Sequence, residues 1–200
     1  MFTESRIRPG NHALNIATGP DSGPPLVLLH GVTRRWQTFL PLVPSLAPRW
    51  QLYGLDFRGH GASEPTDDGY LVINYVDDVV GLLDELNEPA VVYGHSLGAM
   101  VTAAVAARVP EKVRAIVMED PPLNSMGPRF AESTFFPHFK NVHKFAGDQR
   151  EIPVMAKELF ETTVLEPGTG KETTLGAVRD MPSMRFMASC LRKLDPRVLD

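Results

Sequence analysis

The sequence lacks the features of several specialised classes of protein. Its 200 residues include one cysteine, Cys190, which excludes an internal disulfide and is compatible with a reducing cytoplasm. The N-terminus lacks the apolar segment of a secretory signal, and no apolar run approaches the roughly 20 residues that cross a bilayer. From these absences we expect a cytoplasmic protein without a membrane partner.

The charge balance lacks the basic excess of a nucleic-acid-binding protein. Lys and Arg total 20 against 24 Asp and Glu, a formal net charge of -4. Because a nucleic acid or an anionic membrane attracts a basic patch, neither is expected as a partner. Hydrophobic residues make up 43%, which is typical of a globular domain with a sizeable core. The oligomeric state stays open.

Motifs for metals and cofactors are absent as well. The sequence has no H-E-x-x-H pattern and no cysteine cluster, and neither G-x-G-x-x-G nor a P-loop follows a predicted strand. We therefore expect no metal and no cofactor, and a nucleotide-binding doubly wound domain is disfavoured.

Short apolar runs alternate with helical patterns in the first 122 residues. Fully apolar strands that alternate with helices are typical of a parallel sheet covered on both faces. The predicted strands are residues 26–30, 51–56, 90–93 and 113–118, and the predicted helices are residues 35–46, 72–86 and 97–109.

The pattern changes after Pro122, where strand-like apolar runs stop. We predict that residues 1–122 form the N-terminal part of the core and that residues 123–200 form a helical cap region. Its Met and Phe side chains are consistent either with a substrate pocket or with ordinary packing. The predicted cap helices are residues 129–145, 153–165 and 174–194.

Residues 94–98 read GHSLG and fit G-x-S-x-G between a predicted strand and a predicted helix. On such a turn the serine backbone is strained, and the flanking glycines remove Cβ atoms that would collide with neighbouring elements. The hydroxyl then projects at the carboxyl edge of the sheet, where a helix N-terminus favours negative charge. Ser96 is therefore the candidate nucleophile; the alternative is a tight turn with an incidental serine.

Two other turns fit the same picture. Gly31 follows the first predicted strand and lets the next amide face the serine, so we predict an oxyanion hole from the backbone N–H groups of Val32 and Leu97. We expect the His30 side chain to be buried in its turn. Residues 56–63, DFRGHGAS, predict a tight architectural loop held by Asp56 and Arg58, with His60 as a loop residue.

The segments LVLLHG, GLDFRGHGAS and VVYGHSLGAM, in this order, resemble the α/β-hydrolase fold superfamily, and more narrowly its capped esterase, lactonase and C–C hydrolase members. The match covers residues 26–122. The resemblance implies a mostly parallel α/β-hydrolase sheet with flanking helices and a helical cap, the nucleophile Ser96, an oxyanion hole from Val32 and Leu97, and a small-molecule substrate. It also implies an aspartate and a histidine later in the chain.

The later acid and base lack clear candidates. Asp120 and Glu119 end the strand after Ser96 and are fallback acids, although loop-start carboxylates are the simpler interpretation. Two histidines in the predicted cap, His138 and His143, are the corresponding options for the base. The remaining histidines, all before Ser96, are His12, His30, His60 and His95.

The predicted sheet ends at residues 113–118, which leaves an apolar edge strand unpaired. We therefore expect a chain truncated at its C-terminus, with the last strands of the fold missing. Two functions stay open. One is a serine hydrolase that acts on an ester, lactone or related carbonyl compound through a Ser96 acyl-enzyme, with haloperoxidase-type serine relatives also compatible. The other is a truncated or non-catalytic α/β-hydrolase-like protein without the triad histidine.

Overall fold

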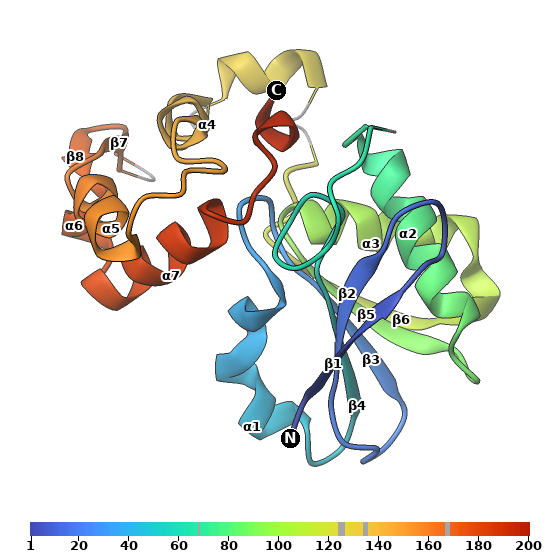
Figure 1. The fold of residues 1–200 in the computed structure, drawn as a ribbon. Coiled ribbons are helices and arrows are strands. Elements are labelled where there is room, and N and C mark those ends of the chain that lie inside the picture. The colour runs from blue at the N-terminus through green and yellow to red at the C-terminus, as the bar shows by residue number, and fades with distance from the viewer. Residues whose placement is uncertain (68, 124–126, 134–135, 167–168) are drawn as a thin grey trace. The chain divides into compact units, whose positions relative to one another are not determined.

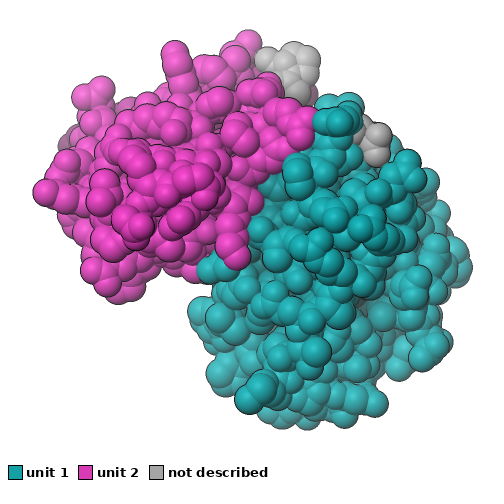
Figure 2. Space-filling view, in the orientation of Figure 1, with its two compact units in different colours: residues 1–122 teal, residues 123–200 magenta. Residues whose placement is uncertain are grey.

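The computed structural model describes residues 1–67, 69–123, 127–133, 136–166 and 169–200 (Figure 1). The chain forms two compact units, Met1–Pro122 and Leu123–Asp200 (Figure 2). The functional roles assigned to these two parts of the chain, a hydrolase core and a cap, stay predictions.

Unit 1 is built on a six-stranded sheet with the order β1-β2-β4-β3-β5-β6. The mostly parallel sheet with flanking helices that the sequence predicts is confirmed, since four neighbouring strands run parallel. These strands are β3 (Pro25–Leu29), β4 (Gln51–Leu55), β5 (Ala90–His95) and β6 (Val113–Glu119).

Two further strands, β1 (Thr3–Ile7) and β2 (Leu14–Thr18), pair antiparallel with each other, and β2 pairs antiparallel with β4. The apolar pattern of the sequence does not predict them. β1 is mostly exposed and polar, so it lacks the apolar run by which the inner strands were found.

Helices cover both faces of this sheet (Figure 1). Val27 and Leu29 of β3 pack into the core under α2 and α3, whereas Leu26 and Leu28 face the opposite core with Phe39. Burial on both faces explains why β3 reads as a continuous apolar run. The helical elements of unit 1 are η1 (Trp36–Leu42), α1 (Val43–Leu46), α2 (Val72–Asp84), α3 (Leu97–Arg108) and η2 (Pro110–Lys112).

β6 lies at the edge of the sheet, as the sequence predicts. Several of its apolar residues are exposed to solvent: Ile116 is 40%, Val117 44% and Met118 38% exposed. Within the described residues its one strand neighbour is β5.

The loop after β4 is held by Asp56, as expected from its sequence. One carboxylate oxygen accepts from the Ala62 N–H and from Asn15 Nδ2, each at 3.0 Å, and the other accepts from the Trp36 N–H at 2.7 Å. The buried carboxylate thereby ties the loop to β2 and to η1. Arg58 has a different role, because its guanidinium reaches α2.

Arg58 forms a buried ion pair with Asp78 of α2. Its Nε and one terminal nitrogen each donate to a carboxylate oxygen at 2.7 Å, and His12 Nε2 lies 3.0 Å from the same carboxylate. The Arg58 and Asp78 residues are only 4% and 2% exposed. Water therefore cannot replace either partner, and each charge depends on the other.

Unit 2 has a core of its own, to which Phe145, Met155, Met184 and Met187 contribute buried side chains. Packing is thus the observed role of these Met and Phe residues within the unit. Its elements are η3 (Gly127–Glu132), α4 (Phe136–His143), α5 (Ile152–Phe160), β7 (Thr163–Leu165), β8 (Glu172–Thr174), α6 (Leu175–Val178), α7 (Met181–Leu191) and η4 (Pro196–Leu199).

The expectation of an entirely helical region after Pro122 is wrong at one place. β7 and β8 form an antiparallel pair: β7 lies within the predicted helix of residues 153–165, whereas β8 overlaps the predicted helix of residues 174–194 only at Thr174. α5 ends at Phe160, and the β-branched residues that follow, among them Thr163 and Val164, favour extended backbone.

In the described ranges, no helix combines the length and apolar character that crossing a membrane requires.

Replacing Asp78 with Asn should lower the free energy of unfolding by about 3 kcal/mol or more, because the buried ion pair with Arg58 is then lost. Urea unfolding at pH 7 measures this loss. The matched control is Asp77→Asn on the same helix, whose exposed ion pair with Arg108 predicts a loss under about 1 kcal/mol. Equal losses in the two variants would contradict the assignment.

Candidate active site

Ser96 occupies the junction between β5 and α3 in a strained backbone conformation, with φ 54° and ψ -115°. Its N–H donates to the carbonyl of Glu119 on β6 at 2.9 Å, and its own carbonyl accepts from the N–H groups of Ala99 and Met100. The surrounding elements thus hold the turn in a conformation that a non-glycine residue seldom adopts.

The glycines on either side of Ser96 are required by contacts with backbone atoms. A Cβ at Gly94 would collide with the carbonyl of Gly98, and a Cβ at Gly98 would collide with the carbonyl of Leu29. Backbone oxygens cannot rotate away as a flexible side chain can. The G-x-S-x-G spacing is therefore a direct consequence of how closely α3 approaches β3 and β5.

The turn after β3 lies beside the turn that carries Ser96. β3 and β5 pair in parallel with Leu29 opposite Gly94, so Val32 and Leu97 follow equally far along the two chains. A Cβ at Gly31 would lie 3.2 Å from the Ser96 Cβ. In the part of the chain that the structure describes, neither the Val32 N–H nor the Leu97 N–H donates a hydrogen bond. Their role as an oxyanion hole stays a prediction.

His30 is fully buried in the turn after β3, as expected. Its Nε2 accepts from the Phe57 N–H at 3.1 Å, and its Nδ1 donates to the Gly31 carbonyl at 2.8 Å. Burial lowers the pKa of His30 to about 4, and the charges of His95 and Arg34 act in the same direction. The ring is therefore neutral at pH 7.

Two other histidines of unit 1, His60 and His12, also have structural contacts. His60 is buried and its Nδ1 donates to the Arg58 carbonyl at 2.9 Å, which agrees with its interpretation as a loop residue. His12 contacts Asp78, and His95 ends β5. Among the described residues of unit 1, no histidine forms a hydrogen bond with Ser96.

The two histidines proposed as a base lie in unit 2. His143 Nε2 lies 3.0 Å from a carboxylate oxygen of Asp200, and the His138 ring contacts the Phe139 ring edge-on. Both side chains belong to α4. Their assignment as a base stays a prediction.

The carboxylates after Ser96 end β6. Glu119 accepts a hydrogen bond from the Tyr93 hydroxyl, and burial, reinforced by this carboxylate, raises the pKa of Tyr93 to about 12. Asp120 is exposed and has φ 49°. Nothing in its contacts tests its predicted role as the acid.

Strained backbone marks this edge of the sheet more broadly than the sequence suggested. Thr33, Ser96 and Asp120 are the described non-glycine residues with positive φ, and they follow β3, β5 and β6. Such residues gather at functional sites, and open parallel sheets bind ligands at this edge. Thr33 and Asp120 were missed as strained positions because neither is a glycine or part of a turn motif.

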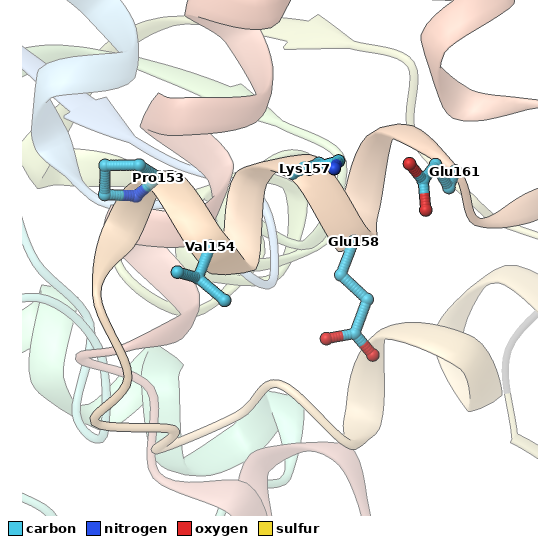
Figure 3. A pocket seen from close by; sticks show the side chains of 5 residues that line it. All are labelled: Pro153, Val154, Lys157, Glu158 and Glu161. Carbon is cyan, nitrogen blue, oxygen red and sulfur yellow. The ribbon is translucent and has the colours of Figure 1, made fainter.

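A shallow hollow along α5 in unit 2 is lined by side chains of one helix, which Figure 3 shows. Glu158 in it pairs with Lys144 and Arg150. The hollow is lined by no serine, threonine or cysteine, and we assign it no reaction. In the described ranges, no group of three or more His, Cys, Asp or Glu side chains could hold a metal ion. The lining residues are Pro153, Val154, Lys157, Glu158 and Glu161.

Comparison with known sequences identifies the class. Residues 24–151 match the sequence model of the alpha/beta hydrolase fold family. The chain therefore belongs to the α/β-hydrolase fold family, which confirms the resemblance seen in its motifs.

Among its relatives is a 2-(acetamidomethylene)succinate hydrolase of Mesorhizobium japonicum, 32% identical over 203 residues that cover 96% of this chain and 70% of the relative. A serine hydrolase-like protein of Danio rerio is 34% identical over 72% of this chain, and a pimeloyl-[acyl-carrier protein] methyl ester esterase of Xanthomonas oryzae is 38% identical over 58%. The chain spans 43% and 42% of these two relatives. The relatives that are similar to this chain in sequence thus include named hydrolases and esterases.

Solved structures of similar fold agree with this family assignment. The crystal structure of an E-2-(acetamidomethylene)succinate hydrolase superposes with a TM-score of 0.67 at 26% identity, covering 96% of this chain and 74% of that one. A deformylase of Pseudomonas putida, at 20% identity and a TM-score of 0.76, shows the shared fold.

Replacing Gly98 with Ala should lower the free energy of unfolding by about 2 kcal/mol or more, because the new Cβ meets the Leu29 carbonyl. Chemical denaturation measures the change. Gly10→Ala is the control, since a Cβ there has nothing within 4 Å and should leave stability nearly unchanged. A fully stable Gly98→Ala chain would contradict the close approach.

The stability of the protein should fall as the pH decreases from about 6.5 to 4, in part through His30. The unfolded chain takes up a proton at this residue in that window, whereas the buried ring does not. The contribution is at most about 3 kcal/mol, complete above pH 6.5 and lost near pH 4. Unfolding in urea at several pH values should show a shallower decline for His30→Asn than for the unmodified protein. Parallel curves for the two proteins would refute the contribution of His30.

Proposed function

We propose that this chain is a serine hydrolase in which Ser96 attacks the carbonyl carbon of an ester, lactone or related small molecule. The observation that carries the proposal is the strained Ser96 at the start of α3, beside the turn of Gly31 and Val32. A serine held in this way presents its hydroxyl at the edge where parallel sheets bind ligands.

The chemistry follows from the groups at that edge. The Ser96 oxygen bonds to the carbonyl carbon, and the carbonyl electron pair moves to oxygen to form an oxyanion. The N–H groups of Val32 and Leu97 donate to this oxyanion, each worth about 3 kcal/mol in the transition state, and the N-terminus of α3 adds favourable partial charge. When the tetrahedral intermediate collapses, the carbonyl double bond re-forms and the leaving group departs. The product is an acyl-enzyme on Ser96, which water then hydrolyses.

The Ser96 proton needs a base, because a serine hydroxyl by itself is a weak nucleophile. His138 and His143 are the candidates in unit 2, with Asp120 as the candidate acid. Without a base, the oxyanion hole and binding alone would still support about 10³-fold catalysis over water.

The substrate class is suggested by the relatives. The match to the relative at 32% identity covers 96% of the chain and therefore both units, and the name of that relative describes an acetamide that carries a dicarboxylate. Other relatives are named methyl ester esterases. Small esters and amides that carry a carboxylate are therefore the first compounds to assay.

A second candidate is a non-catalytic binding protein of the same fold. It is favoured by one observation, that the described residues of unit 1 place no histidine in hydrogen-bond contact with Ser96. Such a protein would keep the fold and the Ser96 turn but would not form an acyl-enzyme.

One experiment separates the two candidates. We expect a fluorophosphonate probe to label the chain at Ser96 and a p-nitrophenyl ester to be hydrolysed, with both activities lost in Ser96→Ala. Mass spectrometry of the labelled peptide identifies the site. Ser45→Ala, at an exposed serine, should behave like the unmodified protein. Absence of labelling and turnover, or labelling that survives in Ser96→Ala, would favour the binding protein.

A further inference from the structure

The Val32 N–H belongs to the same peptide group as the Gly31 carbonyl. In a trans peptide the N–H and the C=O point in opposite directions, so whatever holds the carbonyl also sets the direction of the N–H. The Gly31 carbonyl accepts two hydrogen bonds, from His30 Nδ1 at 2.8 Å and from the Arg34 N–H at 3.1 Å. The two groups that donate to the Gly31 carbonyl therefore also set the direction of the proposed oxyanion donor, the Val32 N–H.

The partners of the His30 ring determine its tautomer. A backbone N–H can only donate, so Nε2, which faces the Phe57 N–H, must be the unprotonated nitrogen. Nδ1 then carries the proton that it donates to Gly31. The ring is fully buried, with the Phe57 and His60 rings 4.9 and 5.0 Å away between centroids. It cannot rotate without losing both hydrogen bonds.

This segment needs such a restraint. Gly31 allows the backbone to approach within contact distance of Ser96, but glycine also has the greatest conformational freedom. Thr33, two residues on, has a φ of 65°, which its side chain disfavours. A peptide between two such positions does not keep one orientation without partners outside its own backbone.

We propose that His30 is a positioning residue, whose neutral ring with the proton on Nδ1 holds the Gly31–Val32 peptide so that the Val32 N–H points at the oxyanion. This inference rests on the proposed function, since it concerns the transition state of that reaction. The ring itself does not touch the substrate. It acts through the peptide, as supporting hydrogen bonds act in other preorganised sites.

The charges around the ring favour this state. His95 lies beside Gly31 and Arg34 follows in the same turn, and both oppose a positive charge on His30, as does burial. A protonated ring would turn an N–H of Nε2 against the N–H of Phe57. The arrangement is therefore compatible with the neutral ring only.

Two substitutions separate positioning from a merely structural role. The side-chain amide of His30→Asn replaces Nδ1 and can donate to Gly31, whereas His30→Gln reaches the place of Nε2 and can accept from Phe57. Each variant loses one of the two hydrogen bonds, so the structural cost is matched. The measurements are the rate of Ser96 phosphonylation by a fluorophosphonate and the kcat and KM for p-nitrophenyl acetate, with thermal unfolding as the fold check.

Positioning predicts that His30→Asn stays within about 3-fold of the unmodified protein, while His30→Gln loses about 30- to 100-fold in phosphonylation rate and kcat with KM nearly unchanged. Equal losses, or no loss in either variant, would overturn the inference. If His30→Gln does not unfold cooperatively, His30→Asn decides alone, because a loss beyond 30-fold refutes positioning and near-normal kcat supports it.

Failure of the proposed function gives a different result, since the unmodified protein would then resist the probe. In that case the amide resonance of Val32 in ¹⁵N-labelled protein decides about the peptide. Both variants lose the ring current of the imidazole, so the Val32 chemical shift should change clearly more in His30→Gln than in His30→Asn. A shift that responds equally to both substitutions would reject the orientation of the peptide by His30.

Discussion

The close approach of backbone to backbone around Ser96 is the constraint on which the rest of unit 1 depends. α3 lies so near to β3 and β5 that neither Gly94 nor Gly98 can carry a side chain. Between these two glycines Ser96 has a positive φ, and Gly31 lies against it. Packing fixes the backbone at Gly94 and Gly98, whereas the Gly31–Val32 peptide also depends on hydrogen bonds from His30 and Arg34 for its orientation.

Buried polar side chains hold the turns that surround this constraint. Asp56 ties the loop after β4 to β2 and to η1, Arg58 joins that loop to Asp78 on α2, and His30 joins the turns after β3 and β4. Each of these groups is out of reach of water and has hydrogen-bond partners. The carboxyl edge of the sheet is therefore shaped by polar contacts, whereas the body of the sheet is held by apolar packing.

The errors of the sequence analysis have the same physical origin as its successes. Inner strands such as β3 were predictable because burial on both faces leaves a continuous apolar run, whereas the exposed β1 leaves none. The strand β7 lies within a predicted helix, because a three-residue strand carries too little pattern to compete with the helical periodicity that precedes it. Strands held by one neighbour and little burial are decided by pairing partners, which local sequence does not contain.

What the sequence by itself determined is the family, the parallel core and the candidate nucleophile, because each rests on local spacing: G-x-S-x-G between an apolar strand and a helix, and His-Gly after the first strand of the parallel core. Tertiary structure alone decided what those residues contact. It made Arg58 a partner of α2, turned Glu119 toward Tyr93, and gave His30 its tautomer through a backbone N–H that lies 27 residues away in the chain. Hydrogen-bond partners far apart in sequence are set by packing of the sheet, and no local pattern encodes them.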